Sequence, residues 1–354
     1  MQRDFTIFIM FFQEFYFIMS CCNHRSVFGP VESRRLGRSL GINLLPFKTC
    51  SMDCIYCECG STTFLTNTRQ EFFPVEAVLQ ELDEALEKIR DRQTEEYPLD
   101  YITFSGLGEP TLHSKFGVLL QRIREKYPRL KVCLLTNASL FSDPVLRKEI
   151  ACADLVIPSL DGSNEVEFQK INRPEKSVTF RKVLDGIIAF RRESAGKVKM
   201  FLEIFLVPGI NDSAASAERF RMLVEEIKPD AVQLNFLDRP GSVADLKVVT
   251  EATLSLFVSR LSGNCKVEIP ARKNTAPGID FANVEFEMLA FLGKSDTANI
   301  ALLAEKLELP ETEIVRHLRQ LRKAGFAEEF SDETGQGGFL RITGKGRMFL
   351  QEKC

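Results

Sequence analysis

The segment Cys50-Ser-Met-Asp-Cys54-Ile-Tyr-Cys57-Glu-Cys59 holds four of the chain's ten cysteines within one short run. Its first three cysteines have the spacing CxxxCxxC, and Tyr56 directly precedes the third. Three thiolates on one short loop can hold three irons of a 4Fe-4S cluster, which leaves the fourth iron open to a small molecule. Structural zinc sites instead use two ligand pairs that are usually separated by about a dozen residues or more. We therefore interpret Cys50, Cys54 and Cys57 as ligands of an iron-sulfur cluster.

This loop resembles the CxxxCxΦC motif of the radical S-adenosylmethionine (SAM) superfamily, in which Φ is aromatic and corresponds to Tyr56. Upstream, residues 29–41 (GPVESRRLGRSLG) resemble the lead-in strand of the wyosine-synthase-like subgroup of radical SAM Fe-S oxidoreductases. Downstream, Phe104-Ser-Gly-Leu-Gly-Glu-Pro-Thr111 resembles the GGEP motif of that subgroup. The resemblance implies SAM as a cofactor. It also implies reductive cleavage of SAM to a 5′-deoxyadenosyl radical that abstracts hydrogen from a substrate.

Beyond the cysteine loop, apolar strand-like runs alternate with amphipathic helical stretches, which predicts parallel βα units rather than hairpins. The expected strands lie at residues 40–45, 101–105, 131–136, 155–159, 199–206 and 231–236. The expected helices lie at residues 74–92, 115–127, 144–151, 178–192, 214–228 and 250–261. The fold class is therefore α/β, with six units forming a partial (β/α)6 TIM-like barrel of the radical SAM type, as the resemblance also implies.

A glycine-rich loop with a carboxylate follows the second expected strand, where parallel α/β folds place functional loops. A glycine pair at a strand end is often only a tight turn, because glycine adopts positive φ at low cost. Glu109 and Pro110 beside Gly106 and Gly108 favour a ligand contact instead. By the resemblance, Gly106, Gly108 and Glu109 are expected to hold the ammonium group of SAM.

Three further polar residues follow the next two expected strands. Asn137 could bind SAM, or it could be a turn or cap residue, because asparagine readily hydrogen-bonds its own backbone. Ser159 and Asp161 match a Ser-x-Asp segment that reaches the ribose hydroxyls or the methionine carboxylate of SAM in the superfamily, although Asp161-Gly162 could also form a turn. Tyr56 could pack behind the cluster, form a wall of the adenine pocket, or do both. Cys59 is expected to be a neighbour of the cluster rather than a ligand.

The composition indicates an intracellular protein. Ten cysteines in 354 residues are too few for a disulfide scaffold, so we expect the reducing cytoplasm. The formal net charge of −3 does not demand a nucleic-acid partner. Residues 1–19 form an apolar, aromatic extension of doubtful status that is short for a membrane span, which needs about 20 apolar residues. We expect Met19 to be the true start and no membrane partner.

A change of pattern after Gly278 predicts a second domain. Helices are expected at residues 284–292, 300–307 and 311–324, followed by a two-stranded wing at 326–343. This order resembles a winged helix-turn-helix domain, whose recognition helix would present Arg316, His317, Arg319, Arg322 and Lys323. Residues 281–354 hold ten Lys/Arg and twelve Asp/Glu, however, whereas nucleic-acid binders normally have a net basic footprint. The expected divisions are a radical SAM core at 20–269, a linker at 270–280 and the winged helix-turn-helix domain at 281–354.

Three functions remain open on the sequence alone. The first is a radical SAM oxidoreductase of unknown substrate, with RNA as one candidate. The second is an activase of a partner protein, and the third is a non-catalytic Fe-S redox sensor that binds DNA through its winged helix. A sensor has no need of the glycine-rich loop or of Ser159 and Asp161, so these residues favour an enzyme. Such an enzyme would need an electron donor of the flavodoxin or ferredoxin type.

Overall fold

The computed structural model describes residues 26–46, 48–91, 97–237, 241–243, 246–263, 265–270, 283–295, 298–307, 309–323, 325–330 and 338–343. The expected extension at 1–19 and nearly all of the expected linker, residues 271–280, lie outside these ranges. No helix in the described part of the chain is both long and apolar enough to cross a membrane.

An eight-stranded sheet with the order β1-β2-β5-β6-β7-β8-β9-β10 forms the centre of the molecule. Every neighbouring pair from β2 to β10 is parallel, and only the first pair, β1 with β2, is antiparallel. The sheet is therefore mostly parallel and confirms the predicted α/β class. Its strands are β1 (Val27–Ser33), β2 (Gly37–Ile42), β5 (Tyr101–Phe104), β6 (Val132–Thr136), β7 (Leu155–Pro158), β8 (Lys199–Leu206), β9 (Ala231–Phe236) and β10 (Lys266–Glu268).

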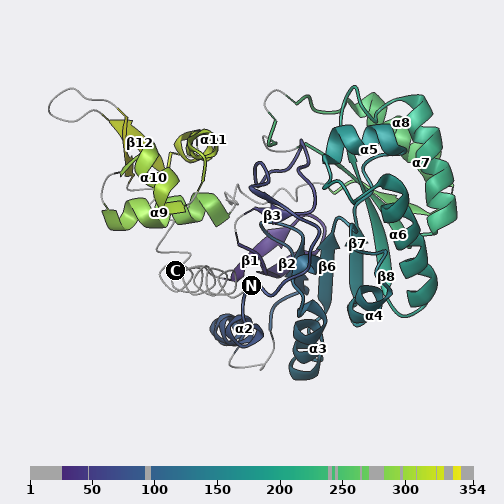
Figure 1. The fold of residues 1–354 in the computed structure, drawn as a ribbon, viewed down its shortest axis with the longest axis horizontal. Helices are drawn as coiled ribbons and strands as arrows, with labels where there is room; N and C mark the ends of the chain where they lie inside the picture. The colour runs from purple at the N-terminus through teal and green to yellow at the C-terminus, as the bar shows by residue number, and fades with distance from the viewer. Residues whose placement is uncertain are drawn as a thin grey trace, which may run out of the picture.

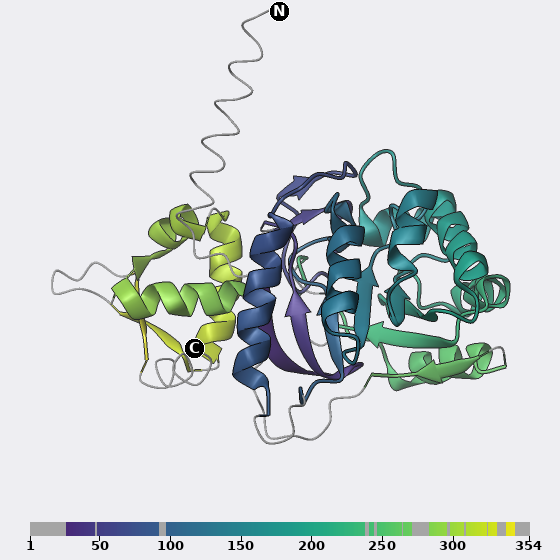
Figure 2. The same ribbon diagram turned by 90° about the horizontal axis from the view of Figure 1, so that it is seen from below.

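Helices cover the outer face of this sheet in an arc, as a partial barrel requires (Figure 1). In the view of Figure 2, α2 and α3 lie across the first strands. Successive turns of these helices bury apolar residues against the sheet, as Val78, Leu82 and Leu86 of α2 do. The helices are α2 (Val75–Ile89), α3 (Phe116–Lys126), α4 (Pro144–Ile150), α5 (Glu165–Asn172), α6 (Phe180–Ser194), α7 (Ala214–Ile227) and α8 (Glu251–Leu261), with a short 3-10 turn at Pro110–Leu112.

All six predicted strands and all six predicted helices of this region are present, and the main sheet and its helices contain three elements outside those two sets, β1, α5 and β10. Strand β1 overlaps the segment expected to be a lead-in strand, but Gly29-Pro30 and several polar residues hide the alternation of a strand. Strand β10 has only three residues, and α5 is short. Asn164 caps α5 by accepting the Glu167 amide, a signal that was overlooked. The predicted strand at 40–45 is also shifted, because β2 runs from Gly37 to Ile42.

The turn between β1 and β2 reaches the inner side of the sheet. Leu36 packs with Leu155 and Ile157 of β7 and with Cys133 of β6. Beside it, Arg35 forms an ion pair with Glu203 of β8. Burial lowers the pKa of Arg35 below its ordinary value, and nearby Cys133 and Glu58 oppose that shift. This turn therefore fills space inside the curved sheet with one apolar side chain and one ion pair.

The C-terminal elements form a unit with an apolar core of their own. Helices α9 (Asn283–Ser295), α10 (Ile300–Leu307) and α11 (Glu311–Lys323) occur where the sequence predicted them. Strands β12 (Ala327–Phe330) and β13 (Phe339–Ile342) pair antiparallel, as expected for the wing, and β11 (Ala298–Asn299) adds a third strand in the order β11-β13-β12. Figure 1 shows these elements grouped beside the sheet, and we call them the C-terminal unit.

Candidate functional site

The cysteine loop begins and ends in a small parallel strand pair. Strand β3 (Thr49–Cys50) pairs with β4 (Phe64–Leu65), and the amide of Thr66 donates to the Cys50 carbonyl at 2.9 Å. Within the loop, the Asp53 carboxylate accepts the Thr62 amide at 2.7 Å. These local bonds close the loop at its base and bring Cys50, Cys54 and Cys57 onto one short turn of chain.

Two distant segments hold the middle of the loop in place. The amides of Asp53 and Ile55 donate to the carbonyls of Asn172 and Ile171 at the end of α5, each at 2.9 Å. From the other side, the Ser242 hydroxyl donates to the Cys54 carbonyl at 2.9 Å. The cysteine loop is thus fixed by residues that lie more than a hundred positions away in the sequence.

Each of the three predicted ligand sulfurs faces an N–H donor from a different segment. The amide side chain of Asn137 lies 3.6 Å from Cys50 Sγ, and that of Asn172 lies 3.3 Å from Cys54 Sγ. The Lys48 ammonium lies 3.0 Å from Cys57 Sγ. Sulfur accepts such bonds most strongly when it is a thiolate, and hydrogen bonds to cluster sulfurs tune the reduction potential of iron-sulfur sites. The donor set therefore fits three sulfurs that carry negative charge.

The charges around Lys48 and Cys57 fit the same assignment, whereas burial keeps the pKa of Cys50 and of Cys54 above the ordinary value of a thiol. Lys48 is almost fully buried, so its ammonium needs an anionic partner. Burial by itself lowers the pKa of Lys48, but Cys57, Cys50 and Cys59 oppose this effect and the pKa is raised overall. The pKa of Cys57 is lowered well below its ordinary value, first by its hydrogen bond with Cys59 and also by Lys48. Burial raises the pKa of Cys50 to about 11, and Lys48 again opposes the shift.

Cys59 differs from the other three cysteines of the run. Its thiol donates to the carbonyl of Gly106 at 3.6 Å, and its side chain packs against the core of the C-terminal unit. Among the described residues, no three His, Cys, Asp or Glu side chains are gathered closely enough for a single metal ion. The Cys59 thiol faces the Gly106 carbonyl, whereas the other three sulfurs face N–H donors.

The glycine-rich loop after β5 lies directly against β3. A side chain at Gly108 would place its Cβ 1.7 Å from the Thr49 carbonyl oxygen, so only glycine fits there. Gly106 has a φ of +125°, and a Cβ at this position would meet the side chain of Asn43. The Asn43 side chain also accepts the amide of Leu107 at 3.2 Å. Both glycines have a packing role, which brings this loop next to the first cysteine of the motif.

Glu109 is a buried carboxylate with several donors. Its Oε1 accepts the Thr111 amide at 3.1 Å, the Thr111 hydroxyl at 2.5 Å and the Thr136 hydroxyl at 2.7 Å. Its Oε2 accepts the Asn137 amide at 2.7 Å. Burial raises the pKa of Glu109 above its ordinary value, and these hydrogen bonds oppose the shift. A carboxylate has about four acceptor positions, so Oε2 keeps the capacity to accept one more donor.

Asp161 and Tyr56 join the loop after β7 to the cysteine loop. The Tyr56 hydroxyl donates to Asp161 Oδ2 at 2.6 Å, and Asn172 donates to the same oxygen at 2.7 Å. The amide of Phe205 donates to Asp161 Oδ1 at 2.9 Å. The Tyr56 ring stacks on Phe205 with centroids 3.8 Å apart. Asp161 is therefore a buried hub that orients the aromatic residue of the cysteine motif.

The remaining predicted residues, Asn137 and Ser159, lie at the same edge of the sheet. Asn137 is half-buried and reaches Ser51 as well as Cys50, so it contacts the cysteine loop directly. Ser159 is half-buried and donates to Glu203 of β8 at 3.5 Å. The structure thus brings Asn137, Glu109, Asp161 and Tyr56 into one hydrogen-bonded network with the cysteine loop, whereas Ser159 points to the neighbouring strand.

Sequence reasoning missed two residues of this network, Lys48 and Asn172. Lys48 lies two positions before the first cysteine and could have been found as a cation next to a thiolate motif. Asn172 is the last residue of α5 and has no spacing relation to the motif, so no sequence signal marks it. Both contacts become visible only when the chain is folded.

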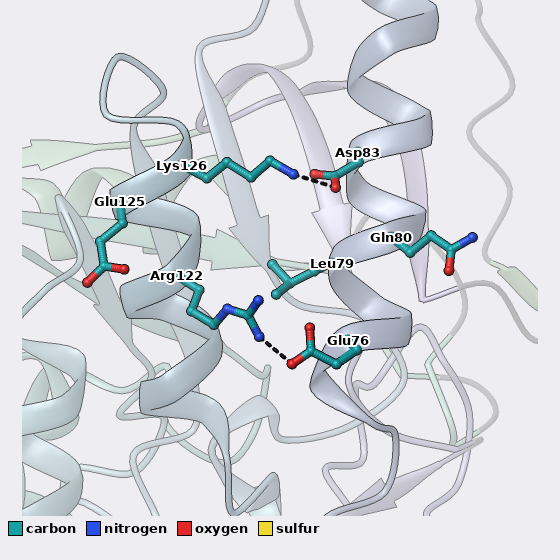
Figure 3. Close-up of a pocket in the computed structure, with 7 residues that line it drawn as sticks. All are labelled: Glu76, Leu79, Gln80, Asp83, Arg122, Glu125 and Lys126. Atoms are coloured by element: carbon teal, nitrogen blue, oxygen red, sulfur yellow. Dashed lines mark hydrogen bonds and ion pairs between the residues drawn. The ribbon is translucent and has the colours of Figure 1, made fainter.

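A groove with a volume of about 510 Å³ lies elsewhere, between α2 and α3 (Figure 3). Ion pairs cross it from Arg122 to Glu76 and from Lys126 to Asp83. None of the predicted site residues lines it, and its charged groups pair with one another. This groove is therefore separate from the candidate site.

The predicted nucleic-acid face of α11 needs a correction. His317 is fully buried and its Nδ1 lies 2.6 Å from Glu285 of α9. Arg316 is mostly buried and its Nε donates to Glu313 at 2.9 Å. The prediction that all five basic residues face a ligand is therefore wrong for Arg316 and His317, whereas Arg319, Arg322 and Lys323 are exposed. The reason is the helical period, because position 317 shares a face with the buried Ile314, Leu318 and Leu321.

An open parallel α/β barrel with a three-cysteine loop after its first parallel strand defines a recognisable class of protein. Residues 44–220 match the model of the radical SAM superfamily, and the chain belongs to that superfamily. Its members are enzymes that carry out SAM-dependent radical chemistry and typically bind an iron-sulfur cluster and SAM. A radical SAM methyltransferase from Sphaerobacter thermophilus has a TM-score of 0.51 at 16% identity, with 65% of this chain and 66% of that chain covered. This likeness concerns the fold alone.

Curated relatives narrow the group further. A UPF0026 protein of Methanocaldococcus jannaschii is 33% identical over 268 residues, which cover 74% of this chain and 80% of that protein. A protein of Brachyspira hyodysenteriae named GTPase Obg is 35% identical over 308 residues, which cover 86% of this chain. The chain spans only 44% of that relative's length. The similarity therefore concerns part of that larger protein.

Proposed function

We propose that this chain is a radical SAM oxidoreductase that holds a 4Fe-4S cluster on Cys50, Cys54 and Cys57. The observation that carries the proposal is the set of three N–H donors, one from each of Lys48, Asn137 and Asn172, that face the three sulfurs. Structural cysteines in an apolar core have no need of a buried lysine and two amides. Three thiolates that share a reduced cluster do need such donors, because they concentrate negative charge in a small volume.

When bound, the cluster would supply the electron that cleaves SAM to methionine and a 5′-deoxyadenosyl radical. The protein's part is to hold the groups in place and to keep water away. Lys48 balances the thiolate charge next to Cys57, and the Asn172 and Asn137 amides orient the other two sulfurs. The Asp161 hub keeps the Tyr56 ring stacked on Phe205, which presents a flat apolar surface beside the loop.

We place SAM at the same edge of the sheet. Glu109 Oε2, which accepts the Asn137 amide and keeps a second acceptor position, would accept the ammonium of the methionine moiety. Gly106 and Gly108 bring their backbone next to the cysteine loop, so the same ammonium can also meet carbonyl groups there. Ser159 would turn from Glu203 toward the ribose or the methionine carboxylate, and Asp161, which already accepts Tyr56, Asn172 and Phe205, would act through Tyr56. Asn137 would then contact both the cluster and SAM.

We propose that the chain belongs to the wyosine-synthase-like subgroup and that its substrate is RNA. The lead-in segment and the glycine-rich loop resemble that subgroup, and the order of helices and strands in the C-terminal unit resembles that of a winged helix. Three exposed cations on α11, Arg319, Arg322 and Lys323, support an RNA contact at the end of that helix. The activase function remains the second candidate, because the C-terminal unit could equally dock a partner protein. A flavodoxin or ferredoxin would deliver the electron.

Anaerobic reconstitution with iron and sulfide, followed by SAM and dithionite, tests the proposal. We expect wild type to form 5′-deoxyadenosine and the alanine variants of Cys50, Cys54 and Cys57 to form none. The measurement is mass spectrometry of the quenched reaction. A fully loaded cluster that yields no 5′-deoxyadenosine would contradict the enzyme and would favour the redox-sensor alternative. RNA retention at low salt that is lost in a variant lacking Arg319 and Arg322 would support RNA, and no retention would count against it.

A further inference from the structure

The C-terminal unit contacts the end of the cysteine loop. In α11, Arg316 Nη1 donates to the backbone carbonyl of Glu58 at 3.3 Å. Glu58 lies directly after Cys57 and directly before Cys59. The donor and the acceptor are 258 positions apart in sequence, so the contact joins two parts of the fold that have separate apolar cores.

Gly60 shows how close this approach is. Its φ is +95°, and a Cβ at this position would lie 2.4 Å from Glu313 Oε2 and 2.7 Å from Arg316 Nη2. A side chain at position 60 would therefore displace the ends of the Glu313 and Arg316 side chains from the loop. The glycine serves two purposes here, because it allows the turn that closes the loop and leaves room for the guanidinium.

Apolar packing extends the same interface. Leu107, which lies between the two glycines of the loop after β5, is buried in the core of the C-terminal unit together with residues such as Leu289 and Leu318. Cys59 packs against this core as well. The cysteine loop therefore contacts the C-terminal unit through the Cys59 side chain, and the glycine-rich loop contacts it through the Leu107 side chain.

The guanidinium of Arg316 is held rigidly on the side of the C-terminal unit. Its Nε donates to Glu313 at 2.9 Å, and its Nη2 lies 2.7 Å from His317 Nε2. An arginine can only donate, so His317 Nε2 accepts and Nδ1 carries the proton that it donates to Glu285. A chain of hydrogen bonds therefore runs from Glu285 of α9 through α11 to the Glu58 carbonyl. Arginine held by such a fork has little freedom left to lose when it binds the loop.

We infer that Arg316 is a positioning residue that clamps the Cys57–Gly60 end of the cysteine loop, and that the C-terminal unit controls the loop through it. The inference rests on the proposed function, because it assigns the clamp a role in holding the cluster. It gives the C-terminal unit a second role besides binding a substrate or partner. A molecule that engages this unit and shifts α11 would loosen the loop that carries the cluster.

Hydrogen exchange in the apo full-length protein tests the clamp without any cluster. The reporting amides are Cys57 and Gly60, which donate to the Cys54 and Cys57 carbonyls inside the loop. We expect these amides to exchange about tenfold faster in Arg316→Ala. A hydrogen bond from a charged donor stabilises the closed loop enough to lower the equilibrium constant for local opening about tenfold. Arg316→Lys should give an intermediate rate, because lysine keeps the charge but not the fork. Arg319→Ala, an exposed change on the same helix, is the matched control and should leave the rate unchanged.

A second measurement follows iron loss from the reconstituted protein to a ferrous chelator. We expect the Arg316→Ala variant to lose iron several-fold faster than wild type and Arg319→Ala. Amides of α9 and α10 report whether the C-terminal unit is folded, and if they lose protection in Arg316→Ala the comparison is made with Arg316→Lys. Equal loop exchange in wild type and both Arg316 variants, with α9 and α10 protected, overturns the clamp. Failure of wild type to take up iron would instead contradict the proposed function, and the apo exchange rates would still decide the clamp.

Discussion

The candidate site around the cysteine loop and the groove between α2 and α3 are two polar regions of opposite character. The groove is hollow and exposed, and its charges pair with one another across two neighbouring helices (Figure 3). At the strand ends the polar groups are buried, and they come from segments as far apart as Cys54 and Asn172. Burying a charged or polar group is costly unless it is paired, so a buried network persists only where it is well satisfied. In this protein, therefore, the candidate functional site is recognised by buried polar groups that meet from distant segments, and not by the presence of a groove.

The largest effect should separate two cysteines that lie two positions apart. Cys57→Ala removes the sulfur next to Lys48, and we expect the reconstituted variant to lose nearly all of its iron, against about four irons per chain in wild type. Cys59→Ala should keep most of its iron, because Cys59 lies beside Cys57 as a hydrogen-bond partner and its thiol also reaches the Gly106 carbonyl. Iron and sulfide analysis after desalting measures both variants. Equal iron loss in both would show that Cys59 belongs to the ligand set.

Glu109→Ala tests the buried carboxylate of the site. The change leaves the donors of Thr111, Thr136 and Asn137 without their acceptor, so we expect the apo protein to lose about 3 kcal/mol in its free energy of unfolding. The reconstituted variant should also bind SAM at least about tenfold more weakly, since a buried charge pair contributes more than about 1.4 kcal/mol. Denaturant titration and equilibrium SAM binding measure the two effects. Unchanged SAM affinity would remove Glu109 from the cofactor site while leaving its structural role intact.

The same carboxyl predicts a pH dependence. Burial raises the pKa of Glu109 above its ordinary value of 4.5, so the folded protein binds this proton more tightly than the unfolded chain does. Its contribution to stability is therefore fully present below about pH 4.5 and declines as the pH rises through the folded-state pKa. We expect the free energy of unfolding of wild type, relative to that of Glu109→Gln, to fall between pH 4.5 and pH 7. A difference that rises or stays flat would contradict the burial of a charged carboxylate.

The smallest effect should come from the groove. Arg122→Ala removes an ion pair with Glu76 in which both side chains are exposed, and we expect a change in unfolding free energy below about 0.5 kcal/mol. The cluster content and 5′-deoxyadenosine formation should match wild type. A loss of cluster content or of 5′-deoxyadenosine formation in Arg122→Ala would mean that the groove takes part in function. It would also remove the contrast between the groove and the candidate site.

How far the sequence predicted this site depends on the range of the contacts. The spacing of Cys50, Cys54 and Cys57 is local, and parallel strands bring Glu109 and Asp161 to the same edge, so the sequence predicts that these residues lie near one another. Lys48 was missed although it is local, because a single lysine before a cysteine carries little signal by itself. Asn172 was out of reach, since its contact with Cys54 spans 118 positions.

The C-terminal unit gives the reverse lesson about the helical period. The predicted helices and the two paired strands are present. The prediction that every basic residue of α11 faces a ligand, however, ignored the helical period. His317 falls on the apolar stripe of Ile314, Leu318 and Leu321, which the sequence already contains. Its burial could have been predicted by counting positions, whereas the contact of Arg316 with Glu58 could not, because it depends on how the two cores meet.

The contact between Gly108 and Thr49 has a consequence for protein engineering. No atom larger than hydrogen fits on the α-carbon of Gly108, because the carbonyl of β3 already occupies that space. The glycine-rich loop and the strand that starts the cysteine motif therefore pack as one unit. A graft of the cysteines onto another scaffold would have to carry residues 106–109 with them, together with the carbonyl on which they rest.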